Sequence, residues 1–158
     1  MNRRVYVVGL ISDTHGLVRP GIAQAFAGVS LIVHAGDVGG GAVLAALEAI
    51  APVEAVYGNV DDAHDPALAR ERVLPIGGRT LHVSHGHELG SPTPELLFAR
   101  YRGDVIAFGH THRALVVWQG DRVAVNPGAA GPRRFDLRPS VARLTFAGGR
   151  VEVDLISL

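Results

Sequence analysis

The chain contains no cysteine and no lysine. Without cysteine it can form no disulfide, no thiolate nucleophile and no zinc site with sulfur ligands. All 15 basic residues are therefore arginines, and 15 acidic residues balance them to a net charge of zero. This balance creates no overall field that would draw the protein to nucleic acid or to an anionic membrane. No apolar run approaches the ~20 residues that a membrane-spanning helix needs. We therefore expect no membrane association and no stable nucleic-acid partner.

The N-terminus resembles the start of a signal peptide, because Arg3 and Arg4 precede an apolar stretch. That stretch is short and no small-residue cleavage site follows it, so a first core strand explains it better and we expect a cytoplasmic protein. A length of 158 residues fits one domain over residues 1–158. With 47% hydrophobic residues, such a domain can bury about 68–70% of its unfolded surface.

Apolar runs alternate with amphipathic stretches through the first two-thirds of the chain, which is typical of an α/β fold. The pattern predicts strands over residues 5–11, 31–35, 53–57, 73–76, 80–84 and 105–108, and helices over 20–27, 42–50 and 94–101, the last capped by Thr93. Two hairpins follow, over residues 114–125 and 141–156. We expect two sheets packed face to face with helices outside, one sheet from the helical part of the chain and one from the final β part.

The first predicted strand, residues 5–11, breaks off into Ser12-Asp13-Thr14-His15-Gly16. In extended backbone, side chains two residues apart point the same way, so Asp13 and His15 would face one point beyond the strand end. A carboxylate and an imidazole aimed together suit a divalent metal. An isolated Asp-x-His motif is more often a turn followed by an exposed histidine, so the interpretation depends on partners elsewhere.

Such partners follow four further predicted strands. Each of these strand ends carries a glycine beside a carboxylate, amide or imidazole, and ligand sites of α/β sheets form beyond the carboxyl ends of strands. The candidate ligands are Asp13, His15, Asp37, Asn59, His85, His110 and His112. Five such strand ends in so short a chain predict a shared metal site. Nitrogen and oxygen ligands without sulfur admit Mn²⁺, Fe²⁺, Zn²⁺, Co²⁺ or Ni²⁺.

The ordered motifs Asp13-x-His15, Gly36-Asp37, Gly58-Asn59-x-Asp61, His85-Gly86-His87 and Gly109-His110-x-His112 resemble those of the calcineurin-like metallophosphoesterases. Within that family the chain is similar to the small, single-domain bacterial and archaeal phosphodiesterase branch, and Asn126-Pro127-Gly128 with Pro132-Arg133 also fits. The resemblance spans residues 5–133 and implies a four-layer α-β-β-α sandwich of two mixed sheets flanked by helices.

The resemblance also implies a dinuclear metal site, for which we expect two Mn²⁺ ions. By matching motifs, Asp13, His15 and His112 would hold the first ion, and Asn59, His85 and His110 the second, with Asp37 bridging both. The implied activity is phosphodiester hydrolysis, in which a metal-bridging hydroxide attacks phosphorus in line. From this resemblance we expect Asp37, Asn59 and His87 to be the catalytic residues.

Two positions depart from the family pattern. Many members carry histidine inside the Gly-Asn-x-Asp motif, where it can protonate the leaving group or bind phosphate, whereas this chain has Val60. Loss of that acid would cost ~10²–10⁴-fold on esters with poor leaving groups. His87 is the nearest replacement by motif position, although we expect it rather to support the metal ligands or to contact the phosphate. Ala129 stands where the branch often has serine.

Several other polar residues have structural interpretations. His34 and His82 are expected to be packed within strands, and His64 to be solvated. Asp61 would orient neighbouring groups or cap the following segment. Arg133 and Arg134 could bind a substrate phosphate, but adjacent loop arginines are more often simply exposed.

Two alternatives to the enzyme remain open at this point. One is a protein-binding scaffold on the same fold, like the retromer subunit that resembles this family. The other is a dinucleotide-binding domain, which the absence of a Gly-x-Gly-x-x-Gly motif after the first strand disfavours. The expected partner is a small phosphodiester whose identity would depend on loops at residues 39–41, 88–94 and 129–138. Trp118 would either be exposed and contribute to a homodimer contact or be buried in the core.

Overall fold

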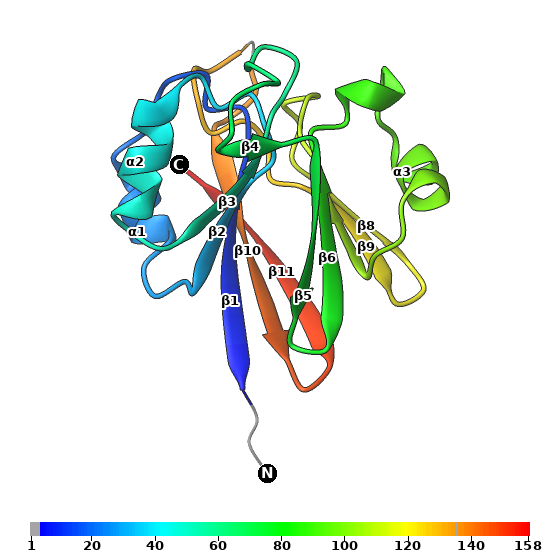
Figure 1. Cartoon of the computed structure of the whole chain (residues 1–158). Helices are drawn as coiled ribbons and strands as arrows, with labels where there is room; N and C mark the ends of the chain where they lie inside the picture. Colours follow the sequence, from blue (N-terminus) through cyan, green and yellow to red (C-terminus); the bar gives the residue numbers. More distant parts are fainter. Residues whose placement is uncertain (1–3, 135) are drawn as a thin grey trace.

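We describe the protein from a computed structural model, which covers residues 4–134 and 136–158. Arg3 of the considered signal-peptide motif and residue 135 of the loop at 129–138 lie outside the described residues. Within the described part, no helix is long and apolar enough to cross a membrane. The chain folds into two β-sheets with helices on their outer faces (Figure 1).

The first sheet has six strands in the order β11-β10-β1-β2-β3-β4. Its parallel part consists of β1 (Val5–Ile11), β2 (Leu31–His34), β3 (Val53–Val56) and the two-residue β4 (Leu68–Ala69). The C-terminal hairpin of β10 (Ser140–Ala147) and β11 (Arg150–Ser157) completes it, with β10 antiparallel to β1.

The second sheet has five strands in the order β5-β6-β7-β9-β8. Its central strands β6 (Arg79–Ser84), β7 (Val105–Ala107) and β9 (Arg122–Asn126) run parallel. The edge strands β5 (Glu71–Ile76) and β8 (Leu115–Gln119) pair antiparallel to β6 and β9 through tight hairpins. Both sheets are therefore mixed.

Three apolar layers hold the sandwich together. The central one lies between the sheets and includes Leu10 and Leu144 from the first sheet and Leu81 and Val125 from the second. A second layer joins the outer face of the first sheet to α1 (Gly21–Ala25) and α2 (Gly41–Glu48). A third joins the second sheet to α3 (Pro94–Arg100). This confirms the predicted four-layer α-β-β-α sandwich.

The local elements agree with the prediction, including the cap of α3, where the Thr93 hydroxyl accepts a hydrogen bond from the backbone N–H of Leu96 at 3.3 Å. The assignment of strands to sheets was wrong in two respects. The strands β5, β6 and β7 belong to the second sheet although they come from the helical part of the chain. The final hairpin does not join the second sheet but returns to pair with β1, so each sheet mixes early and late parts of the chain. The strand β4 was not predicted, because two residues are too few to show a period.

Candidate metal centre

The predicted ligands converge at the carboxyl ends of the parallel strands, at the top of the view in Figure 1. Backbone hydrogen bonds extend the ladder beyond the strands and fix the loops to one another. The N–H of Asp13 donates to the carbonyl of Gly36, and that of His15 to the carbonyl of Asp37, both at 3.0 Å. In the second sheet, the N–H of Gly109 after β7 donates to the carbonyl of His85 after β6, also at 3.0 Å. The loops are thus held by main-chain bonds.

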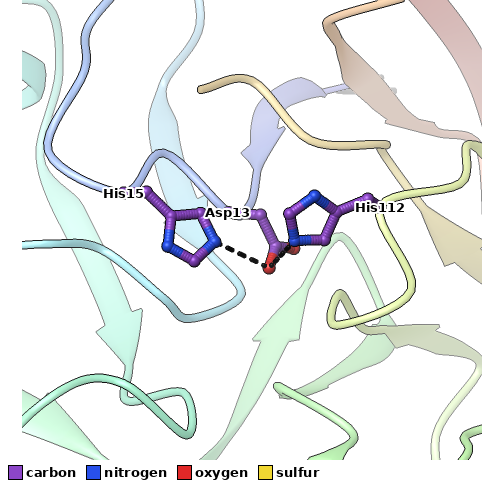
Figure 2. A group of neighbouring side chains, drawn as sticks. All are labelled: Asp13, His15 and His112. Atoms are coloured by element: carbon purple, nitrogen blue, oxygen red, sulfur yellow. Dashed lines mark ion pairs between the residues drawn. The ribbon is translucent and has the colours of Figure 1, made fainter. Parts of the chain in front are cut away.

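One group of side chains consists of Asp13, His15 and His112 (Figure 2). Their ligand atoms lie within 4.8 Å of one another, with Asp13 Oδ1 at 3.2 Å from His112 Nε2 and 3.7 Å from His15 Nε2. The other carboxylate oxygen, Asp13 Oδ2, accepts hydrogen bonds from the Ser12 hydroxyl and from the backbone N–H of His110. One oxygen is therefore satisfied, while Oδ1 faces two imidazoles.

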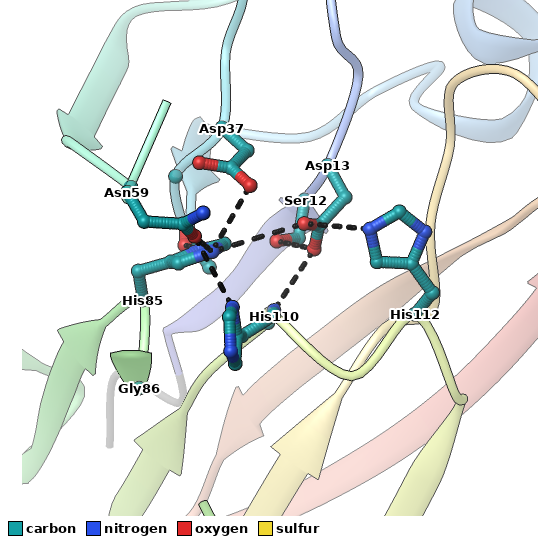
Figure 3. Close-up of polar contacts among 12 residues, drawn as sticks. Ser12, Asp13, Asp37, Asn59, His85, Gly86, His110 and His112 are labelled. Atoms are coloured by element: carbon teal, nitrogen blue, oxygen red, sulfur yellow. Dashed lines mark hydrogen bonds and ion pairs between the residues drawn. The ribbon is translucent and has the colours of Figure 1, made fainter. Parts of the chain in front are cut away.

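A second group lies next to the first and contains Asn59, His85 and His110 (Figure 3). The amide oxygen Asn59 Oδ1 is 3.1 Å from both His85 Nε2 and His110 Nδ1. Neighbouring ligands around a metal with bonds near 2.1 Å are separated by roughly 3 Å. The three atoms therefore have the spacing of ligands that share one ion.

Asp37 lies between the two groups. Its Oδ2 atom is 3.3 Å from His85 Nε2 in the second group and 3.7 Å from His15 Nε2 in the first. Its Oδ1 atom accepts a hydrogen bond from the backbone N–H of Val60 at 3.1 Å, which fixes the carboxylate plane. Gly58 makes this approach possible, because a Cβ at that position would overlap the Asp37 carboxylate.

The backbone is strained where the candidate ligands are placed. Among the described residues, five that are not glycine have φ between +46° and +72°. All five are predicted ligands: Asp13, His15, Asp37, His110 and His112. The left-handed region costs an L-residue on the order of 1 kcal/mol or more and is concentrated at functional sites. The expectation that Asp13 and His15 sit in extended backbone was wrong, although their side chains do meet.

Burial and neighbouring charges shift the pKa values of these groups. Burial alone would raise the pKa of Asp13, but the neighbouring imidazoles of His112 and His15 hold it well below its ordinary value. The pKa of Asp37 is lowered in the same way, against burial, by His85. His85 shows the converse, since Asp37 and Asp13 raise its pKa despite burial. The pKa of His15 is raised chiefly by Asp13. Both carboxylates are therefore ionised at neutral pH. Their negative charges favour a bound proton or cation at His15 and His85.

Two buried ligand atoms of the first group are suited to a divalent cation. Within the described residues, the buried atoms Asp13 Oδ1 and His15 Nε2 have no hydrogen-bond partner. Buried polar atoms are rarely left unpaired in native proteins. A cation between the imidazole nitrogens and carboxylate oxygens would satisfy both, and the mixture of nitrogen and oxygen donors suits first-row divalent metals. The residues present therefore fit such an ion.

Several supporting residues hold the candidate ligands in place. The Asp61 carboxylate accepts hydrogen bonds from the backbone N–H groups of Val38, Gly39 and Gly58, which ties the loops after β2 and β3 together. This agrees with the orienting role expected of Asp61. The Asn126 side chain donates to the carbonyl of Gly109 at 3.1 Å and to the Thr111 hydroxyl at 3.0 Å.

The positions of Asn126 and of Ser12 in this network were not predicted. Ser12 directly follows β1 and Asn126 ends β9, so both residues lie at strand ends, as the candidate ligands do. This position was the feature of the sequence that could have pointed to a role in the network. Their partners belong to loops that are distant in sequence, so local patterns could not identify the contacts.

The remaining histidines behave largely as expected. His34 is buried, accepts a hydrogen bond at Nδ1 from the N–H of Gly36 and contacts the Thr14 hydroxyl through Nε2. His82 is buried and pairs with Glu71 at 2.7 Å, whereas His64 is exposed. His87 begins the 3₁₀ helix η1 (His87–Leu89), and its ring centroid lies 5.4 Å from that of His85 and 6.4 Å from that of His110.

Four further residues from the sequence analysis lie at the surface. Val60 is 58% exposed, and both Arg133 and Arg134 are exposed. Trp118 is 50% exposed, which excludes the core position considered for it.

Comparison with known proteins agrees with this geometry. Residues 7–149 match the calcineurin-like phosphoesterase superfamily domain. A "Probable metallophosphoesterase" of Methanothermobacter thermautotrophicus is 34% identical over 95% of this chain and 91% of its own length. The "Probable metallophosphoesterase YsnB" of Bacillus subtilis is 36% identical over 87% of this chain and 82% of its own. Phosphodiesterase YfcE of Escherichia coli K12 is 34% identical over 49% of this chain and 44% of its own.

Solved structures share the fold at lower sequence identity. Vacuolar Protein Sorting 29 from Cryptosporidium parvum has a TM-score of 0.80 and 22% identity, with 98% of both chains covered. A structure described as a novel archaeal phosphodiesterase has a TM-score of 0.77 and 23% identity, with 96% of this chain and 99% of that chain covered. Together with the family match over most of its length, the convergent ligand set shows that the chain belongs to the calcineurin-like phosphoesterase superfamily.

Proposed function

We propose that this protein is a phosphodiesterase that depends on two divalent metal ions, with Mn²⁺ as the expected cofactor. The observation that carries the proposal is the unpartnered Asp13 Oδ1 atom, which lies buried among the Nε2 atoms of three histidines. Family membership supports hydrolase activity, and the name of the E. coli relative supports diesters as substrates.

The side chains divide into two ligand sets that share Asp37. We assign Asp13, His15 and His112 to the first ion and Asn59, His85 and His110 to the second, because the short contacts separate in this way. Divalent cations in such a site make water a nucleophile at neutral pH and neutralise phosphate charge. The protein contributes the rigid loops that hold these ligands.

His87 lies next to the second ligand group. Its ring lies beside His85, His110 and Tyr57, and its Nδ1 atom is buried with no hydrogen-bond partner among the described residues. We infer that His87 contacts the substrate phosphate and replaces, in part, the acid missing at Val60. The exposed Val60 side chain can neither donate nor accept a proton.

The test is hydrolysis of bis(p-nitrophenyl) phosphate by the Mn²⁺-loaded protein. We expect faster turnover of this diester than of the monoester p-nitrophenyl phosphate. The variant Asp37→Asn should lose at least about a hundredfold in kcat, because it removes the shared carboxylate. Asp62→Asn, which changes an exposed neighbour of Asp61, should retain activity. No hydrolysis with Mn²⁺, Fe²⁺, Zn²⁺, Co²⁺ or Ni²⁺ would contradict the proposal.

A second function, a non-catalytic protein-binding scaffold, is favoured only by the shared fold with Vacuolar Protein Sorting 29. The two functions differ in what they require of Asp37. If Asp37→Asn retained full function in the cell, the scaffold would be supported and the enzyme contradicted.

A further inference from the structure

A cavity adjoins the candidate metal centre on the His112 side. It has a volume of about 670 Å³ and lies between the residues before α3, the loop after β7, the start of β8 and the end of β11. Sites for small molecules typically have volumes of about 300–1,000 Å³. His112 lines this cavity and also contacts Asp13 in the first ligand group. A single ligand can therefore occupy both the cavity and the metal centre.

The walls of the cavity are mainly apolar. Leu115 and Leu155 contribute to them from the edge strands of the two sheets, and Leu137 from the loop before β10. Leu115 is 38% exposed and Leu155 is 44% exposed, so both leucines leave apolar surface in contact with solvent. Covering such surface by a ligand is favourable by about 25 cal/mol per Å².

Polar side chains in the walls are already engaged with the protein. The Ser140 hydroxyl donates to the carbonyl of Pro127 at 2.6 Å, and the Thr111 hydroxyl accepts a hydrogen bond from Asn126. Arg113 and Arg138 also line the cavity and are exposed. Their positive charges favour an anionic ligand. The walls therefore suit an apolar group joined to an anion.

We propose that this cavity binds the apolar ester group that a phosphodiester substrate retains after hydrolysis. The inference rests on the proposed phosphodiesterase function. Water supplies the oxygen that bonds to phosphorus, the bond from phosphorus to the leaving oxygen breaks, and the leaving alcohol takes up the proton. His87 lies beside the second ligand group, whereas the cavity opens beside the first. The leaving group is thus directed toward His87, and the retained ester stays on the His112 side.

The inference is tested with two diesters that release the same p-nitrophenolate. Benzyl p-nitrophenyl phosphate carries an apolar retained group, and methyl p-nitrophenyl phosphate does not. We expect kcat/KM to be about tenfold higher for the benzyl ester, mainly through KM, since apolar pockets discriminate by factors of this size. The variant Leu155→Glu should reduce this ratio to about one, mainly by raising KM for the benzyl ester, because a charged side chain replaces part of the apolar wall. Leu115→Glu, on the other wall, should act in the same way.

Leu96→Glu is the matched control, because Leu96 is 47% exposed on α3 and does not line the cavity. It should keep the native ratio of the two esters. Direct binding provides a readout without turnover: benzylphosphonate, but not methylphosphonate, should shift the methyl NMR signals of Leu115 and Leu155 in the Zn²⁺-loaded protein. Equal kcat/KM for both esters in the native protein would overturn this inference and leave the phosphodiesterase intact. Hydrolysis of neither ester would overturn the proposed function itself.

Discussion

The Nδ1 atom of His85 lies 2.8 Å from the carbonyl oxygen of Ala35. A carbonyl can only accept a hydrogen bond, so Nδ1 carries the proton, and in the neutral ring Nε2 presents a lone pair. That lone pair faces Asp37 Oδ2 at 3.3 Å and Asn59 Oδ1 at 3.1 Å. Only a cation or a second proton makes this arrangement favourable. The Ala35 contact therefore prepares His85 as a metal ligand.

Metal binding should release protons in a pH-dependent manner. In the metal-free protein the carboxylates of Asp13 and Asp37 raise the pKa values of His15 and His85, which favours the protonated rings. A metal displaces these protons, and its apparent affinity therefore falls as the pH is lowered. Calorimetric titration with Mn²⁺ in buffers of different ionisation enthalpy should report more protons released per bound ion at pH 6.5 than at pH 9. Release that does not change with pH would contradict this assignment.

A methyl group at position 109 should disrupt the site. A Cβ there would overlap the Ser12 hydroxyl and approach Asp13 Oδ2 to 2.6 Å, so Gly109→Ala must displace the carboxylate of the first ligand group. We expect Mn²⁺ affinity to weaken at least tenfold. Gly41→Ala is the control, because a Cβ at the start of α2 meets no atom within 4 Å. Equal metal affinity in both variants would show that the close packing at Gly109 is not required.

Introducing a histidine at position 60 should increase activity on diesters with poor leaving groups. Val60 is exposed next to the Asp37 carboxylate that its backbone N–H binds, so a longer side chain fits there. Val60→His should raise kcat about tenfold or more for diesters with alkoxide leaving groups, since these need a proton. Hydrolysis of bis(p-nitrophenyl) phosphate should change less than threefold. Val60→Gln, which cannot supply that proton, is the control, and an equal gain in both variants would exclude acid catalysis.

Buried His34 should make the protein less stable in acid. Burial lowers its pKa to about 4, from 6.5 in the unfolded chain. The unfolded state therefore takes up the proton first, and the free energy of unfolding falls as the pH drops from 6.5 to about 4, by roughly 3 kcal/mol in total. Urea unfolding of His34→Gln should show a shallower pH dependence than the native protein. The exposed-site variant His64→Gln should keep the native dependence, and a parallel curve for His34→Gln would contradict the prediction.

The sequence was sufficient to predict the strand ends and the candidate ligands that meet beyond them, because buried strands and the residues after them are local features. Ala107 and Gly109, for example, already indicate where β7 stops before His110. The pairing of β10 with β1 could not be predicted in this way. It joins Ala142 to Leu10 across more than a hundred residues, and no local pattern specifies such a contact.

The backbone conformation of the candidate ligands could not be predicted from the sequence either. Positive φ at Asp13 and His15 is imposed by the bonds that their N–H groups make to the neighbouring loop, with Gly36 and Asp37 as acceptors. Isolated residues of these types prefer other conformations. Only the folded sheet, which sets two loops side by side, offsets that strain.

We infer that loops distant in sequence hold two metal ions around Asp37. Crystals of the Mn²⁺-loaded protein would show the positions of these ions by anomalous diffraction. We expect two anomalous peaks, one among Asp13, His15 and His112 and one among Asn59, His85 and His110, with the Asp37 carboxylate between them. Anomalous peaks elsewhere on the protein, with none at Asp37, would contradict this inference.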